Sequence, residues 1–269
     1  MAKQYDKYGF RFREWDIYKD ARKFRIEINN LLKNYPKEEK YTLIDQTKRA
    51  LNSIILNIAE GSNIVFACIA PHPPILLPSV GSEKDRVQVK KTIESLNSLG
   101  GKLKESNPNS IIISAPHSDW GFNVPLFFLA KDFKGEIKTY LIGLEKPKFY
   151  FEKGAKLLKD KLLKELEKEK KYAFIASGDL SHCLKAEGPY GFHQDGPKFD
   201  KALIDALKKK DIETILKLDE IYPGAGECGL RSFCFLLGIL EESKINYQPE
   251  ILSYEGPFGV GYLVANFKL

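Results

Sequence analysis

The segment IVFACIAPHPPILLP, residues 64–78, decides the fold of this chain. It begins with a short apolar run and ends in a loop that holds His72 between Pro71 and the pair Pro73-Pro74. The apolar run predicts a buried strand. Each proline fixes its own φ angle and restricts the residue before it, so the loop loses little entropy when it presents a side chain. The segment therefore predicts a strand that ends in a rigidly held histidine.

Two further histidines have the same placement. SIIISAP, residues 110–116, precedes His117, and YAFIASGDLS, residues 172–181, precedes His182; the chain has 4 histidines in all. If the three strands are parallel neighbours, their carboxyl ends meet at one edge of the sheet. Any one histidine could simply cap or pack, but three repeats of one placement favour a shared site. Imidazoles gathered without a matching number of buried acids indicate a metal.

The pattern of apolar residues changes at Gly61-Ser62-Asn63, which predicts two domains, residues 1–63 and 64–269. After the boundary, short apolar runs alternate with amphipathic stretches, a pattern typical of an α/β domain. We expect strands at 64–69, 110–114, 125–130, 137–142, 172–177, 248–253 and 259–267, and helices at 83–104, 150–170, 198–209, 211–218 and 227–242.

Before the boundary, residues 14–61 are predicted to form an antiparallel helical hairpin. Apolar residues recur at three- to four-residue steps on both sides of a break at 34–40, and Pro36 suits the first turn of the second helix. A hairpin cannot bury both of its apolar stripes alone. It is therefore expected to pack on the rest of the chain or on a second copy, as a homo-oligomer.

Composition narrows the function classes. Net charge is +6, and residues 1–63 carry 13 Lys+Arg against 9 Asp+Glu, an excess too modest to favour nucleic-acid binding. No apolar stretch is long enough for a membrane span, and the start has no apolar signal core. The 4 cysteines show no CxxC spacing and are expected to be reduced. These features predict a cytoplasmic protein with no membrane association.

A carboxylate that could complete the metal site lies in YPGAGECGLRSF, residues 222–233. Glu227 follows a Gly-Ala-Gly loop and is predicted to open a helix, where a negative charge is favourable. Two imidazoles and one carboxylate leave half of an octahedral Fe(II) shell open. An ordinary glutamate at a helix start is the alternative.

Residues 64–269 resemble the class III extradiol ring-cleavage dioxygenases of the LigB type, a superfamily that includes the Memo proteins. IAPHPPILLP, ISAPHSDW, SGDLSH, GPKFDKALIDAL and GECGLRSF carry the resemblance in that order, and the first motif is similar to the AmmeMemoRadiSam-type variant. The resemblance implies an α/β fold with a single sheet and flanking helices. It also implies that His72, His117 and Glu227 bind Fe(II), with Zn or Cu as alternatives, and that His182 is the catalytic acid/base.

The implied reaction is the oxygen-dependent cleavage of a catechol-type small molecule. Asp119, Asp179 and Ser181 are expected to orient imidazoles, His193 to contact the substrate, and Arg231 to pair with an acid or with an anionic substrate. Cysteines 68, 183 and 228 lie close to the ligand segments; core packing is expected for them, with a thiolate metal site as the alternative.

The N-terminal segment, residues 8–63, resembles the first half of the four-helix-bundle proteins encoded in ribosomal RNA intervening sequences. FREWDIYKDARKF and YPKEEKYTLIDQTKRALNSIILNIAEGSN carry this resemblance, and the last two helices of the bundle are missing.

Two rivals to the dioxygenase hypothesis stay open. One is a Memo-like metal-binding module that acts with a radical-SAM partner on an unknown small molecule. The other is an interaction protein whose metal site is vestigial.

Overall fold

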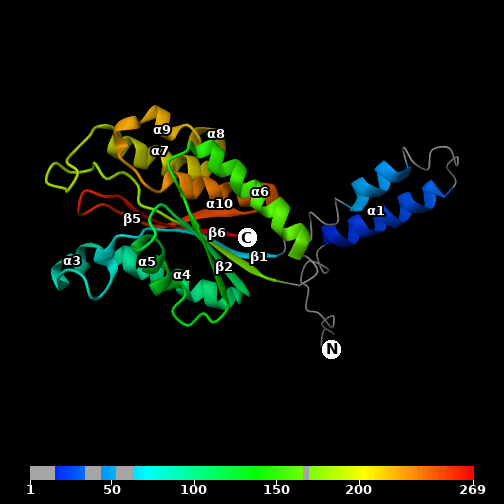
Figure 1. The fold of residues 1–269 in the computed structure, drawn as a ribbon, viewed down its shortest axis with the longest axis horizontal. Helices are drawn as coiled ribbons and strands as arrows, with labels where there is room; N and C mark the ends of the chain where they lie inside the picture. Colours follow the sequence, from blue (N-terminus) through cyan, green and yellow to red (C-terminus); the bar gives the residue numbers. More distant parts are fainter. Residues whose placement is uncertain (1–15, 34–43, 53–62, 166–169) are drawn as a thin grey trace. The chain divides into compact units, whose positions relative to one another are not determined.

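The computed structural model describes residues 16–33, 44–52, 63–165 and 170–269. The chain divides into two compact units: residues 1–63 with 243–245, and residues 64–242 with 246–269 (Figure 1). Gly61 and Ser62 of the expected domain boundary lie outside the described residues. So do residues 166–169 of the helix expected over 150–170. None of the described helices combines the length and the apolar character needed to cross a membrane.

The larger unit is built on one mixed sheet of six strands in the order β3-β2-β4-β1-β6-β5. Strands β1, β2, β3 and β4 are parallel, whereas β6 is antiparallel to β1 and to β5. Their bounds are β1 Ile64–Ala70, β2 Ser110–Ala115, β3 Glu136–Leu141, β4 Tyr172–Ser177, β5 Gln248–Glu255 and β6 Tyr262–Lys268. The predicted α/β class with a single sheet is confirmed.

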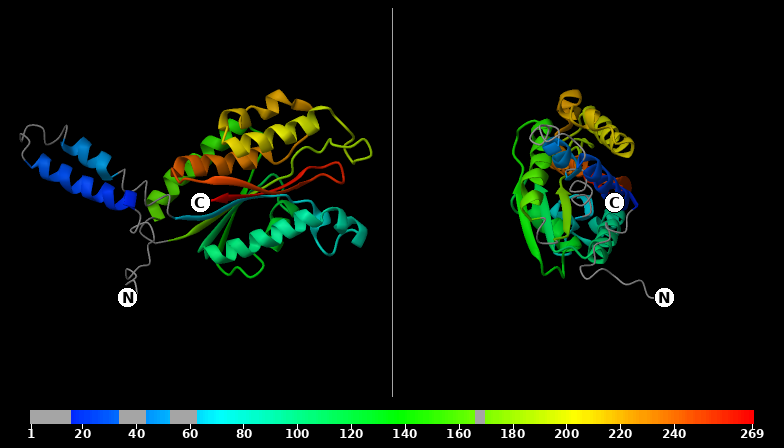
Figure 2. Two further views of the ribbon diagram at one scale, coloured as in Figure 1. Left: turned by 180° about the vertical axis from the view of Figure 1, so that it is seen from behind. Right: turned by 90° about the vertical axis from the view of Figure 1, so that its right-hand side faces the viewer.

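Helices cover both faces of this sheet (Figure 2). Helices α3, α4 and α5 lie on one face, and α6 to α10 lie on the other (Figure 1). Their bounds are α3 Glu83–Gln88, α4 Lys90–Ser106, α5 Trp120–Leu129, α6 Pro147–Glu165, α7 Asp195–Lys209, α8 Ile212–Ile215, α9 Leu218–Ile221 and α10 Leu230–Ser243, with short 3-10 turns η3 Pro74–Leu76 and η5 Pro223–Ala225.

One expected strand, residues 125–130, is wrong: residues 125–129 belong to helix α5, and Ala130 caps its C-terminal end. Its buried positions include Gly121, Phe122, Val124, Pro125 and Leu129, which recur at helical rather than alternating spacing. An unbroken apolar run has no periodicity that separates a buried strand from a buried helix. The helix packs against α4 and against strands β2 and β4, so tertiary burial decides its conformation.

The expectation of three parallel neighbours is confirmed, because β4 lies between β1 and β2. Ala70 at the end of β1 is level with Ser177 at the end of β4, and Ser114 of β2 is level with Ala176. All three strands therefore end at the same edge of the sheet. The loops that follow them bring their histidines to that edge.

The loop after β4 is anchored to α7 and to the last two strands. Asp200 of α7 accepts hydrogen bonds from the backbone N–H of Ser181 (2.8 Å) and from the hydroxyl of Tyr254 (2.5 Å). Backbone bonds in both directions join this loop to Gly261. Burial raises the pKa of Asp200 to about 7, although its two hydrogen bonds oppose the shift.

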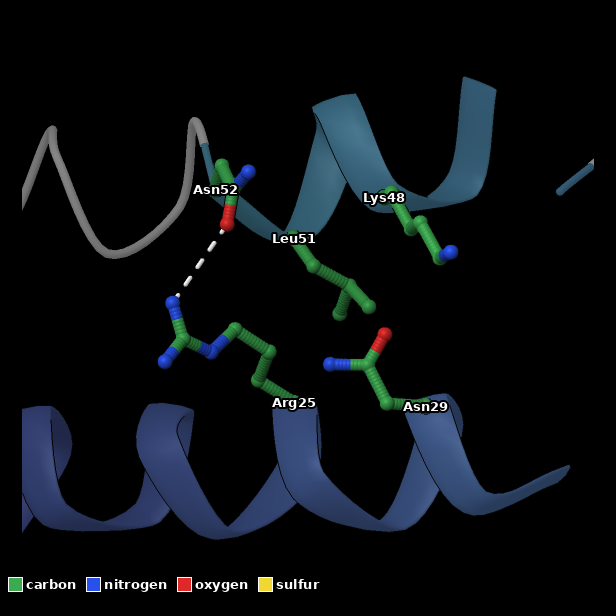
Figure 3. Close-up of a pocket in the computed structure, with 5 residues that line it drawn as sticks. All are labelled: Arg25, Asn29, Lys48, Leu51 and Asn52. Atoms are coloured by element: carbon green, nitrogen blue, oxygen red, sulfur yellow. Dashed lines mark hydrogen bonds between the residues drawn. The ribbon is translucent and has the colours of Figure 1, made fainter. Parts of the chain in front are cut away.

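In the smaller unit, α1 (Asp16–Leu32) is followed by a second helix at residues 44–52. Leu32, Ile44 and Leu51 are buried. Arg25 and Asn52 form a hydrogen bond of 3.4 Å across a pocket that is also lined by Asn29, Lys48 and Leu51 (Figure 3). The expected hairpin also included residues 14–15, 34–43 and 53–61, which lie outside the described residues.

Helices α6 and α10 cross at two glycines, and this contact can be tested by mutation. A Cβ on Gly238 of α10 would overlap the backbone carbonyl oxygen of Phe151 in α6. Gly238→Ala is expected to lower the free energy of unfolding by about 1–3 kcal/mol, because overpacking forces the helices apart. Urea unfolding measures the change. The matched control is Gly101→Ala in α4, where a Cβ meets open space. The control should be neutral or more stable by about 0.5–1 kcal/mol, and equal losses in both variants would contradict this account.

Asp200 predicts a pH-dependent stability. Because its pKa is about 7 in the folded chain and near 3.8 in the unfolded chain, the folded state holds the proton more tightly. Wild-type stability should therefore fall as pH rises from about 4 to 7, by up to ~4 kcal/mol, relative to Asp200→Asn. Urea unfolding at pH 5 and pH 8 gives the difference. Asp205→Asn on the same helix is the control, since Lys201 holds the pKa of Asp205 below its usual value and outside this window. A pH-independent difference for Asp200→Asn would refute the assignment.

Candidate metal centre

His72 is the most enclosed of the predicted ligands, with 1% of its surface exposed. Its backbone N–H donates to Asp179 Oδ1 at 3.0 Å, which ties the proline loop after β1 to the loop after β4. Its Nδ1 lies 3.0 Å from Ser177 Oγ, and that hydroxyl donates to the carbonyl oxygen of Gly121 at 2.5 Å. The ring is thus held by groups from β4 and α5 as well as by its own loop.

The other ring nitrogen of His72 faces a cluster of donor atoms. Its Nε2 is 3.5 Å from Cys228 Sγ, and the ring of His117 lies edge-on with a centroid distance of 5.2 Å. One donor atom from each of His72, His117 and Cys228 lies within 4.8 Å of the others. Asp179, His182 and Cys228 form a second such group, so Cys228 belongs to both. The structure therefore brings the three predicted histidines to one place.

These residues fit a metal ion chemically. Burial, with the nearby His117, lowers the pKa of His72 to about 3, so its imidazole is neutral at physiological pH. Burial also lowers the pKa of His182 and raises that of Cys228 well above its usual value. His182 Nε2 is buried without a hydrogen-bond partner among the described residues. Neutral imidazoles suit Zn, Cu and Fe, a thiolate is a soft ligand, and a bound cation lowers the pKa of a coordinating thiol.

Asp179 is the acid closest to this cluster. Its Oδ2 is 3.8 Å from His72 Nε2, and its Oδ1 accepts from the backbone N–H of the same residue. Burial raises the pKa of Asp179 to about 6, although the N–H of His72 and the neighbouring histidines oppose the shift. Asp179 thus holds the backbone of the loop that carries His72, and its role in orienting an imidazole stays a prediction.

Cys228, expected from the sequence to pack in the core, is a functional candidate in the structure. The backbone N–H of Asp179 donates to its Sγ at 3.3 Å, and the N–H of Gly229 donates to the carbonyl of Asp179 at 2.9 Å. Gly178 and Gly229 lie so close that a Cβ on Gly178 would overlap the Cα of Gly229. This close approach joins the loop after β4 to the start of α10. The only sequence signal was the position of Cys228 beside a predicted ligand.

Glu227, the predicted carboxylate ligand, lies outside both donor groups found among the described residues. Its carboxylate accepts hydrogen bonds from the backbone N–H of Leu230 (2.6 Å) and from Arg231 Nη1 (2.8 Å). The helix therefore begins at Leu230 rather than at 227, with Glu227 capping its first turn. Arg231 also lies 3.4 Å from Asp219, so it pairs with acids, one of its two expected roles. Ligation by Glu227 stays a prediction.

The remaining predicted residues have other partners in the described structure. Ser181 donates to the carbonyl of Ala225 and accepts from the N–H of Cys183, so it supports the loop rather than an imidazole. His193 accepts at Nδ1 from the N–H of Asp195, and its ring packs on the backbone of Gly224. Asp119 directly precedes α5, where its carbonyl accepts from the N–H groups of Phe122 and Asn123.

Two exposed aromatic residues lie beside the histidines. Trp120 is 45% exposed, with its ring centroid 5.6 Å from that of His117. Tyr190 is 62% exposed, with its centroid 5.0 Å from that of His182. Trp120 is the last residue of the ISAPHSDW motif, whereas nothing in the sequence distinguishes Tyr190. Together they offer apolar surface next to the donor cluster.

Comparison with known proteins agrees with this geometry. Residues 117–265, more than half of the chain, match the family of the catalytic LigB subunit of aromatic ring-opening dioxygenase. That range contains His117, His182 and Cys228, whereas His72 precedes it. Residues 13–64 match the 23S rRNA-intervening sequence protein family. The α/β unit and the helical segment thus have separate relatives.

Individual proteins are also similar to this chain. Protein CA_C1420 of Clostridium acetobutylicum is 30% identical over 283 residues, covering 74% of this chain and 56% of that protein, so the chain spans little more than half of its relative's length. The crystal structure of uncharacterized protein JW3007 from Escherichia coli K12 has 14% identity and a TM-score of 0.49, and covers 76% of this chain and 99% of that one. A similarity that slight supports no argument about activity. The family match over residues 117–265 shows that this chain belongs to the LigB family, with a 23S rRNA-intervening sequence protein segment before it.

Proposed function

We propose that residues 64–269 form a metal-dependent enzyme acting on a small molecule, with a transition-metal ion bound by His72, His117 and Cys228. The observation that carries the proposal is the approach of these three donor atoms within 4.8 Å at the shared edge of β1, β2 and β4. The family match favours Fe(II), and Zn or Cu are the alternatives that the same ligands could bind.

The reaction we propose is the oxygen-dependent cleavage of a catechol-type ring. Fe(II) would supply Lewis acidity and redox chemistry. His182 is uncharged because burial lowers its pKa, so it can take a proton from a substrate hydroxyl at neutral pH. Trp120 and Tyr190 offer faces on which a flat ring can pack. Each of these roles belongs to a residue of this chain beside the donor cluster.

One observation favours the Memo-like alternative, in which the metal site serves another reaction with a radical-SAM partner. Cys228, and not Glu227, faces the histidines, while both oxygens of Glu227 accept hydrogen bonds elsewhere. A thiolate in place of a carboxylate changes the electron density that the metal receives. An interaction protein with a vestigial site is the third hypothesis, and stoichiometric metal in the purified protein would exclude it. Assembly of copies through residues 1–63 remains a proposal of its own.

Metal binding is expected to release a proton from Cys228. The pKa of this thiol is raised well above its usual value, so the proton stays until a cation displaces it, whereas His72 is already neutral. At pH 7.5, wild type should therefore release one more proton per Co(II) bound than Cys228→Ser. Titration calorimetry in buffers of different ionisation enthalpy measures the count, and the thiolate-to-Co(II) absorption band should vanish in the variant.

Glu227→Gln is the matched comparison, because it alters the neighbouring residue without touching the thiol. We expect it to keep the absorption band and the proton count of wild type. Lost Co(II) affinity in Glu227→Gln, together with wild-type binding in Cys228→Ser, would contradict the proposed ligand set and restore Glu227 as the third ligand.

Oxygen uptake tests the proposed reaction. After anaerobic loading with Fe(II), wild type should consume oxygen with at least one member of a catechol panel, and His182→Ala should lower kcat by about 10²- to 10⁴-fold. Trp120→Ala should chiefly raise KM, with Phe127→Ala, an exposed aromatic on the same helix, as its control. Absence of uptake across the panel in a fully loaded protein would refute ring cleavage and favour the Memo-like alternative. Wild-type turnover in His182→Ala would remove that residue from its role.

A further inference from the structure

We propose that Ser177 and Pro125 are positioning residues that fix the tautomer of His72, so that its Nε2 carries a lone pair toward the donor cluster. The tautomer follows from contacts within the chain. Its consequence for metal binding rests on the proposed function.

The Ser177 hydroxyl has a single proton, and its position decides the tautomer. A backbone carbonyl oxygen can only accept, so the 2.5 Å contact between Ser177 Oγ and the carbonyl of Gly121 must contain that proton. The contact of 3.0 Å between Ser177 Oγ and His72 Nδ1 then needs a proton from the ring. Nδ1 is therefore the protonated nitrogen. Because the neutral imidazole carries one proton, Nε2 has none.

Pro125 explains why the carbonyl of Gly121 is available. Inside a helix, the carbonyl of residue 121 normally accepts from the N–H of residue 125. Helix α5 runs through Pro125, which has no N–H to donate. The Ser177 hydroxyl takes the place of that missing donor. The carbonyl of Gly121, which lacks its usual donor in α5, thus becomes the last acceptor in a chain of hydrogen bonds that starts at His72.

Burial isolates this chain of hydrogen bonds from solvent. Ser177 is fully buried and His72 almost so, which keeps water from exchanging with either hydrogen bond. With the tautomer fixed in this way, Nε2 faces Cys228 Sγ at 3.5 Å and can bind a cation without first losing a proton. Partners of this kind fix the tautomer and the ring orientation of metal-binding histidines.

The test begins with the metal-free full chain. Nitrogen-15 NMR of the imidazoles at pH 7.5, with His72 assigned by the signals lost in His72→Gln, should show Nδ1 protonated and Nε2 not. A major form protonated at Nε2 would overturn the proposal, whether or not the protein binds metal. Observation of the expected tautomer in a protein that fails to bind Co(II) would refute the proposed function while leaving the tautomer assignment supported.

Two variants assign the effect to residues. In Ser177→Ala the preference for Nδ1–H should be lost and Co(II) affinity should fall about 10- to 100-fold. Ser110→Ala is the matched control. Ser110 is also a buried serine that donates to a backbone carbonyl, that of Glu136, but it lies at the end of β2 away from the histidines. It should match wild type in both measurements. An unchanged tautomer in Ser177→Ala, or an equal loss in Ser110→Ala, would overturn the role of Ser177.

Pro125→Ala tests the helix end of this chain of hydrogen bonds without altering Ser177. The new N–H should compete for the carbonyl of Gly121 and lower the fraction of Nδ1–H at His72. A wild-type fraction in this variant would overturn the role of Pro125.

Discussion

The parallel pairing of β1, β4 and β2 is the constraint on which the rest of the site depends. Because β4 lies between the other two, the loops after all three strands leave from one edge, within reach of each other. Antiparallel pairing of any one strand would send its histidine to the opposite edge. The sheet thus brings together residues that are 45 and 65 positions apart in the chain, namely His72, His117 and His182.

The meeting of the three loops at one edge of the sheet does not by itself determine which side chain of the segment before α10 faces the histidines. The close packing of two glycine backbones determines it. Gly178 and Gly229 approach so closely that the start of α10 is joined to the loop after β4. In that position Cys228 faces inward to His72, while Glu227 accepts from the backbone N–H of Leu230 at the helix start and from Arg231. Neighbouring residues in one chain therefore have opposite environments, one in the donor cluster and one in an ion pair.

Much of the fold was predictable because its signals are local. Buried strands such as β1 and β2 are short apolar runs ended by proline or polar residues, and the helix of residues 90–106 has a clear amphipathic period. The error at residues 125–130 has a physical cause: α5 is buried on several sides, so its sequence shows neither period. Pro125 gives no signal for a helix either, since a proline is unfavourable in a helix interior.

The sequence by itself determined which residues could form a site and how rigidly some of them would be held. The prolines around His72 and the repeated placement of histidines after apolar runs are properties of the chain, since they depend on covalent geometry and on local burial. Only the tertiary structure decided which of two adjacent residues, Glu227 or Cys228, would face those histidines. That choice depends on the direction in which α10 begins. Contacts with a loop some fifty residues earlier in the chain determine this direction.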